Sequence, residues 1–180
     1  MERWDLYTKD RVKTHRQIAR GMRQPEGTYR LVAHVCVFNS RGEMLIQQRQ
    51  PFKSGWSNLW DISAGGSVVA GETSAQAAQR ELDEELGLLA PLEDKRPRLT
   101  VNFRGGFDDI FILQEDVELS ALKLQEEEVQ AVRWATLEEI LAMIEEGIFI
   151  PYSPDFIRVM FFLKDQEGMH TRSDFTRATH

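Results

Sequence analysis

The stretch that most constrains this chain runs from Gly66 to Leu88 and reads GSVVAGETSAQAAQRELDEELGL. Thr73 and Gln76 have the spacing of a helix-opening capping box, and Gly87 stands where a left-handed residue would end a helix. The residues between them are good helix formers, with no proline and no internal glycine. The stretch therefore predicts a glycine-containing segment followed by a helix of about three turns.

The helix has an apolar stripe and, beside it, an acidic arc. The apolar residues recur at three- and four-residue steps, as expected for a face packed on a core: Ala75, Ala78, Leu82 and Leu86. Glu81, Glu84 and Glu85 share an arc about 100° wide beside that stripe. Like charges at these spacings repel, and Arg80, which can reach Glu84, cannot neutralise all three.

A divalent cation can neutralise such a cluster. Mg²⁺ takes a few carboxylates and completes its coordination shell with water and substrate phosphates. An arbitrary glutamate-rich helix is usually a solvated acidic face. Here the preceding glycines and the complete spacing favour a metal site on Glu81, Glu84 and Glu85.

The same residues resemble the Nudix box, in which a glycine is followed by a Gly-Glu pair and then by Arg-Glu-Leu-x-Glu-Glu-x-Gly-Leu. Every fixed position is filled, from Gly66 through Gly71-Glu72 to the run 80–88. The resemblance implies an α/β fold, a Nudix-type α/β/α sandwich with a mixed β-sheet between helices. It also implies a hydrolase in which water attacks a phosphorus of a diphosphate.

The resemblance implies roles for the residues of the box. Glutamates at the positions of Glu81, Glu84 and Glu85 bind Mg²⁺, for which Mn²⁺ can substitute, or act as the base. The carbonyl at Gly66 often joins the coordination, and Arg80 and Glu72 orient the cluster. Metal ions neutralise the charge that develops on the phosphate oxygens and sharpen the attacking water.

Further candidates lie outside the box. Arg49 at a strand end, Lys53 in the next loop and Trp56 are candidate substrate-binding residues, through phosphate contacts or stacking. Nudix hydrolases commonly draw one more carboxylate, as metal ligand or base, from the loop before a late strand. Glu128 is the first choice there and Glu127 the second.

Weaker candidates are also present. Asp108 and Asp109 stand at the start of a strand, and Cys36 has the setting of a buried structural thiol. The histidines share no spacing that suggests zinc: they are His15, His34, His170 and His180.

The element pattern is strands, helix, strands, helix, helix. Residues 1–26 are expected to form an extension packed on the same domain, with a short strand or hairpin near residues 4–7. The hydrolase domain is expected at 27–167, and 168–180 as a frayed, flexible tail. The expected strands are 29–38, 43–48, 59–64, 98–104, 107–113 and 129–134. Further helices are expected at 136–146, opened by a Thr-x-x-Glu capping box, and from Ser153-Pro154 to about Gln166.

Composition narrows the function classes. A net charge of −7 over 180 residues argues against a nonspecific nucleic-acid binder. One cysteine allows no intrachain disulfide, and no secretory signal or apolar run of bilayer length is visible, so we expect a cytoplasmic enzyme without a membrane partner. The expected partner is a small-molecule diphosphate. The sequence leaves open whether the chain forms a homodimer.

Outside the box the chain resembles the branch of the family related to isopentenyl-diphosphate isomerase, over about four fifths of its length. The resemblance runs from Trp4-Asp5 through Phe38-Asn39, Gly42, 45–49 and Trp60 to 129–134. Isomerisation is therefore a rival to hydrolysis.

The isomerase uses a cysteine as acid/base partner and metal-binding histidines. Gly65 aligns with the cysteine, and Ser67 and Arg30 align with two of the histidines. Glycine cannot move a proton, and serine and arginine do not replace a neutral imidazole ligand. The isomerase is therefore the less favoured reading.

A noncatalytic sensor of a diphosphate ligand is a third reading. Such proteins usually lose box glutamates or gain a DNA-binding domain, and this chain does neither. The substrate favoured by sequence is a nucleoside di- or triphosphate or derivative, followed by an isoprenoid or coenzyme-A diphosphate.

Overall fold

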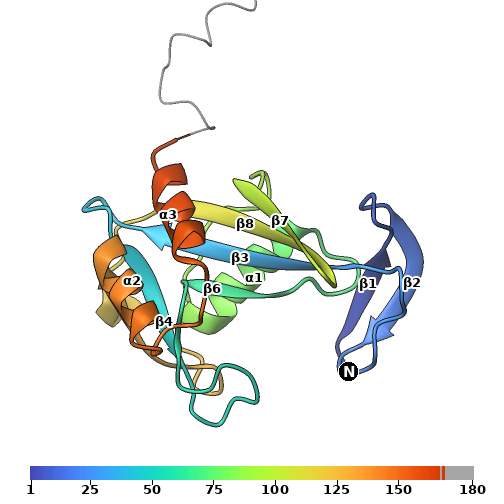
Figure 1. Cartoon of the computed structure of the whole chain (residues 1–180), viewed down its shortest axis with the longest axis horizontal. Coiled ribbons are helices and arrows are strands. Elements are labelled where there is room, and N and C mark those ends of the chain that lie inside the picture. Colours follow the sequence, from blue (N-terminus) through green and yellow to red (C-terminus); the bar gives the residue numbers. More distant parts are fainter. Residues whose placement is uncertain (167, 169–180) are drawn as a thin grey trace, which may run out of the picture.

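A mixed β-sheet forms the centre of the molecule in a computed structural model that describes residues 1–166 and 168 (Figure 1). Its long strands β3 (Arg30–Phe38) and β8 (Gly106–Gln114) run parallel, in register from Arg30 opposite Gly106 to Phe38 opposite Gln114. The strand order is β5-β4-β3-β8-β7, with β6 paired to β3 and β9 paired to β4. The other strands are β4 (Met44–Arg49), β5 (Trp60–Asp61), β6 (Ala64–Ser67), β7 (Leu99–Phe103) and β9 (Val129–Ala135).

Helices cover both faces of this sheet, as the α/β/α sandwich requires. One face packs on α1 (Ser74–Leu86), and the other on α2 (Leu137–Glu145) and α3 (Pro154–Leu163). A short 3₁₀ turn, Leu119–Ala121, lies between β8 and β9. The expected apolar stripe of α1 is buried in the core on its side of the sheet. The sandwich fold is thus present as predicted.

The N-terminal residues form a separate two-stranded antiparallel sheet, β1 (Arg3–Tyr7) and β2 (Lys13–Ala19). This hairpin lies beside one end of the central sheet (Figure 1). A β-bridge joins Tyr7 to Tyr29 just before β3, and the Ala70 N–H donates to the Arg3 carbonyl at 2.8 Å. The sequence indicated a short strand or hairpin near residues 4–7, and the structure has the hairpin, with bounds for its second strand that the sequence did not give.

The helix boundaries follow local signals in the sequence. Thr73 with Gln76, and Thr136 with Glu139, form reciprocal capping boxes at the starts of α1 and α2. Gly87 ends α1 in the left-handed region at φ 64°, where a side chain would be strained. These predicted caps are confirmed.

The strand that leads into the box differs from the prediction. The strand expected at 59–64 is two short strands, and Gly65 and Gly66 lie inside β6, paired with His34 and Ala33. Glycine fits there because a neighbouring element comes too close for a side chain.

The last helix is shorter than predicted. It ends at Leu163, and the Gln114 side chain donates to the Lys164 carbonyl at 2.9 Å, in place of a continuing helical hydrogen bond. Ser153 holds the cap position, but its side chain makes no capping hydrogen bond. Cys36 is buried, as expected for a structural thiol.

Among residues 1–166 and 168, no helix combines the length and the apolar character needed to cross a membrane. The predicted tail 168–180, with His170 and His180, lies outside the described residues apart from Gly168.

Candidate active site

Five segments of the chain line one pocket of about 460 Å³. They are the N-terminal hairpin, the end of β4 with its following loop, β6, the C-terminal half of α1 and the loop before β9. The lining residues are Glu2, Trp4, Arg20, Arg49, Lys53, Ser54, Gly55, Gly65, Gly66, Ser67, Glu81, Glu84, Glu85, Gln125 and Glu128. The pocket therefore contains all the predicted metal-site residues.

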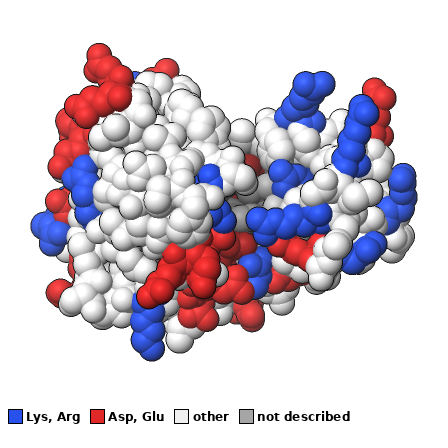
Figure 2. Space-filling model, turned by 90° about the horizontal axis from the view of Figure 1, so that it is seen from below, with Lys and Arg blue, Asp and Glu red and all other residues white. Residues whose placement is uncertain are grey.

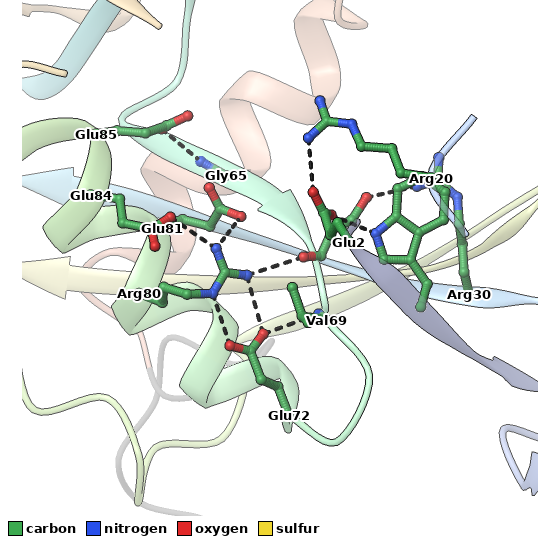
Figure 3. Close-up of polar contacts among 12 residues, drawn as sticks. Glu2, Arg20, Arg30, Gly65, Val69, Glu72, Arg80, Glu81, Glu84 and Glu85 are labelled. Atoms are coloured by element: carbon green, nitrogen blue, oxygen red, sulfur yellow. Dashed lines mark hydrogen bonds and ion pairs between the residues drawn. The ribbon is translucent and has the colours of Figure 1, made fainter. Parts of the chain in front are cut away.

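Arg80 is the centre of the ion-pair network at this pocket (Figure 3). Its guanidinium donates to both oxygens of Glu72, at 2.8 and 3.1 Å, and its Nη1 donates to Glu81 at 2.8 Å and to Glu84 at 3.1 Å. The hydrogen bonds that Arg80 donates to Glu72 raise the pKa of Arg80. Burial opposes this shift, and the charge of Glu81 adds to it. Arg80 thus orients the cluster from the side.

Glu85 is the most buried of the three glutamates, at 5 % exposed. Its Oε2 accepts from the Gln47 side chain at 2.9 Å and from the Gly65 N–H at 3.3 Å, both neutral donors. Burial, followed by repulsion from Glu81, raises the pKa of Glu85 to about 8. Burial likewise raises the pKa of Glu81, against the attraction of Arg80.

Gly66 lies directly against the acidic cluster. A Cβ at this position would stand 2.2 Å from Glu81 Oε1, so with any larger residue the Glu81 carboxylate would have to move away from the β6 backbone. The requirement for glycine at the start of the box therefore has a steric cause here.

The cluster fits a divalent cation by its charge and its donor type. Glu72, Glu81 and Glu84 pair with one arginine, and Glu85 lines the same pocket with neutral hydrogen-bond donors, so negative charge is in surplus. Carboxylate oxygens are the ligands that Mg²⁺ prefers. Within the part of the chain that the structure describes, no three acidic, histidine or cysteine side chains already converge as a complete metal site. The carboxylates thus suit the ion in charge and donor type. Their side chains would have to rotate to bring the oxygens together around it.

The candidates outside the box lie in different places. Lys53 pairs with Glu128 at 2.5 Å inside the pocket, so the predicted phosphate ligand contacts the predicted loop carboxylate. Arg49 also lines the pocket, and its Nε donates to the Gly55 carbonyl at 3.2 Å. Trp56 is 54 % exposed and is not among the lining residues. The exposed Glu127 is not among them either.

Asp108 and Asp109 do not reach this pocket. Successive residues of β8 point to opposite faces, and each aspartate has its own partner. Asp108 bonds to His34 Nδ1 at 2.8 Å, and Asp109 accepts from Arg11 at 2.9 Å and from Thr100 at 2.7 Å. These contacts give both aspartates a structural role.

Three lining residues from the N-terminal hairpin were not singled out as site residues from the sequence: Glu2, Trp4 and Arg20. They reach the pocket through tertiary packing, which leaves no local spacing pattern. The one available signal was the resemblance around Trp4-Asp5.

Comparison with known proteins agrees with the geometry. The NUDIX domain family matches residues 28–155. An uncharacterised Nudix hydrolase of Listeria innocua is 46 % identical over 170 residues, which cover 94 % of this chain and 99 % of that protein. The chain belongs to the Nudix family.

Other Nudix proteins extend the likeness. Nudix hydrolase 3 of Arabidopsis thaliana is 33 % identical over 167 residues, covering 84 % of this chain but 22 % of that longer protein. The crystal structure of DR0079 from Deinococcus radiodurans superposes with a TM-score of 0.71 and 27 % identity, covering 88 % of this chain and 99 % of that one. This chain is accordingly a Nudix hydrolase.

Three positions of this Nudix hydrolase bear on the rival isomerase chemistry. A Cβ on Gly65 would stand 2.0 Å from His34 Cδ2, so no cysteine side chain has room there without a shift. Arg30 donates to Ser67 Oγ at 2.8 Å. At the positions that the resemblance aligns with two metal-binding histidines, the chain thus holds an arginine–serine hydrogen bond.

Proposed function

We propose that this Nudix hydrolase cleaves a diphosphate bond in a nucleoside diphosphate derivative or a similar small molecule, with Mg²⁺ as its cofactor. The observation that carries the proposal is the common pocket of Glu81, Glu84, Glu85 and Glu128, which also contains Arg49 and Lys53. Carboxylates for a cation and cations for phosphate oxygens are the two components that such a reaction needs.

Glu81, Glu84, Glu85 and Glu128, together with the Gly66 carbonyl, would hold the metal. When bound, Mg²⁺ supplies charge neutralisation at the phosphate oxygens and lowers the pKa of the attacking water. The P–O bond to the leaving phosphate breaks as the bond from the water oxygen forms.

The remaining residues bind and orient. Arg49 and Lys53 suit phosphate oxygens, since arginine offers paired donors and lysine a compact charge. Lys53 contacts Glu128, so a phosphate that takes this lysine would free the Glu128 carboxylate to hold the metal or to accept a proton from water. Arg80 and Glu72 keep the box carboxylates in place through their own ion pairs.

The neutral donors on Glu85 also have a part. Gln47 and the Gly65 N–H fix one oxygen of Glu85 and leave the charge of this carboxyl for the cation. We further propose a cytoplasmic location, which the single free and buried cysteine suits.

The test is the appearance of diphosphate cleavage products, separated by chromatography, from a panel of nucleoside di- and triphosphates, sugar nucleotides, coenzyme A and isoprenoid diphosphates. Wild type and Glu84→Gln are compared with Mg²⁺, with Mn²⁺ and after chelation. Turnover of one class by wild type, lost on chelation and in the variant, is the expected result. An inert panel with conversion of isopentenyl diphosphate to its allylic isomer would refute the hydrolase assignment. Tight binding with neither activity would point to a sensor.

A further inference from the structure

The N-terminal hairpin supplies part of the pocket wall. Glu2, Trp4 and Arg20 line the same pocket as the box glutamates, although they precede residues 28–155, which match the family domain. A ligand in this pocket would therefore face side chains that lie outside the matched domain.

This wall is fixed to the box rather than loosely attached. The Arg30 guanidinium lies 4.7 Å from the centre of the Trp4 ring and donates to Ser67 Oγ beside Gly66. Asp5 accepts from the Gly71 N–H at 2.8 Å. A cation–π contact and hydrogen bonds at several points hold the hairpin in one position against the box segment.

The N-terminal residues 1–30 have a net charge opposite in sign to that of the rest of the chain. Residues 1–30 contain eight Lys and Arg against four Asp and Glu, a net charge of +4 in a chain of −7. Figure 2 shows basic side chains on the lobe at the right, where Figure 1 places the hairpin, and acidic side chains gathered beside it. A basic wall next to an acidic, metal-binding one suits a substrate whose phosphates face both.

Arg20 is the basic side chain of the hairpin that reaches the pocket. It follows β2 directly, and Figure 3 shows it extending over Glu2 toward the side where Gly65 and Glu81 lie. Its guanidinium pairs with Glu2 at 2.8 Å, but the Arg20 side chain is 64 % exposed, and exposed ion pairs are weak. A phosphate, with more charge and more acceptor oxygens, can compete for this guanidinium.

We propose that Arg20 is a substrate-binding residue that contacts a phosphate group of the diphosphate from the hairpin side of the pocket. Arg49 at the end of β4 and Lys53 in the loop after it approach from another side, so the phosphates are held from two walls. This inference rests on the proposed function, since it presumes a diphosphate in this pocket.

The first experiment measures binding without turnover. The probe is imidodiphosphate, whose P–N–P link resists hydrolysis, titrated by calorimetry into wild type in the presence of Mg²⁺. Arg20→Ala is compared with Arg16→Ala, which removes the same charge from an exposed position on β2 outside the pocket. Arg20→Lys tests whether the paired donors of arginine matter, and thermal melting checks that each variant is folded.

The Kd for imidodiphosphate should be about tenfold higher in Arg20→Ala, because about tenfold corresponds to the loss of one charged hydrogen bond. In Arg16→Ala the Kd should stay within about twofold of wild type. With the substrate found by the panel, Arg20→Ala raises KM and leaves kcat within about twofold. An unchanged Kd in Arg20→Ala, an equal loss in both variants, or no binding by wild type would overturn the inference.

The two proposals fail separately. Hydrolysis that depends on Glu84, with an unchanged Kd in Arg20→Ala, would refute the role of Arg20 alone. Binding of imidodiphosphate that is weakened in Arg20→Ala, in a protein that hydrolyses nothing, would refute the proposed function and leave Arg20 as a phosphate ligand.

Discussion

Two groups of carboxylates in this molecule look alike in sequence and differ in their surroundings. Glu81, Glu84 and Glu85 on α1 line a pocket, in which Glu81 and Glu84 share Arg80 and Glu85 accepts from neutral donors. Asp108 and Asp109 on β8 are each matched by a partner of their own, His34 and Arg11. The first group has more negative charge than its neighbours neutralise, and the second group does not.

The difference separates acids that bind a ligand from acids that hold the fold. A carboxylate with a fixed partner contributes to stability and has little left for a cation. A carboxylate that is buried among neutral donors, as Glu85 is, carries an electrostatic cost that a bound metal would relieve. Substitutions should therefore affect activity in one group and stability in the other.

The largest expected effect is on catalysis, in Glu85→Gln. The raised pKa of about 8 means that near neutral pH, without metal, this carboxyl mostly keeps its proton, so the neutral amide replaces it with little loss of stability. The charge needed for Mg²⁺ is lost, and kcat/KM should fall on the order of 10²-fold or more. Steady-state kinetics and a melting curve measure both. Near-normal activity, or a strongly lowered melting temperature with normal activity per folded molecule, would erase the contrast.

Asp109→Asn should do the opposite. Asp109 is 0 % exposed and bonded to Arg11 and Thr100, so removing its charge leaves the arginine without its partner. We expect a loss of about 2 kcal/mol in the free energy of unfolding and kcat/KM within about twofold of wild type. Urea unfolding and kinetics on the same preparation measure this. Asp10→Asn, in a pair with Lys9 whose side chains are both largely exposed, is the control and should cost little.

A smaller effect on activity is expected at the loop before β9. Glu128 lines the pocket against Lys53, whereas the adjacent Glu127 is exposed outside it. Glu128→Gln should lower kcat/KM about tenfold, and Glu127→Gln should leave it within about twofold. Equal effects of the two substitutions would show that the loop acts only through its charge.

The parts of this picture that were predictable from sequence are those set by local chemistry. The caps Thr73 and Thr136, the left-handed Gly87 and the three-to-four spacing of the box glutamates all depend on residues within one or two turns. The same local information gave most strands of the sheet. It also located the metal-site candidates, because the helix alone brings them onto one arc.

The rest depends on contacts between distant segments. The local sequence around Arg20 does not show that this residue lines the pocket. The hairpin is placed there by Arg30, which stacks on Trp4 and donates to Ser67. The separation of Asp108 from Asp109 likewise depends on what lies on each face of β8. Trp56 is a candidate substrate-binding residue because of its place in a loop. In the structure its backbone has a positive φ of 52° and its ring is exposed.

The smallest expected effect is a pH dependence of the contrast. Burial would raise the pKa of Asp109, but hydrogen bonds from Arg11, Ser74 and Thr100 lower it below its ordinary value of 3.8. A carboxyl with a lowered folded-state pKa contributes stability that is present above 3.8 and lost as the pH falls through the folded-state value. The gap in unfolding free energy between wild type and Asp109→Asn should therefore be constant above about pH 5 and narrow below 3.8. Urea titrations of both proteins at each pH measure it, and other acid-sensitive pairs, such as Asp5 with Lys13, cancel because both proteins have them. A gap that stays constant down to the acid limit would show that the Asp109 contacts stabilise the protein through shape rather than charge.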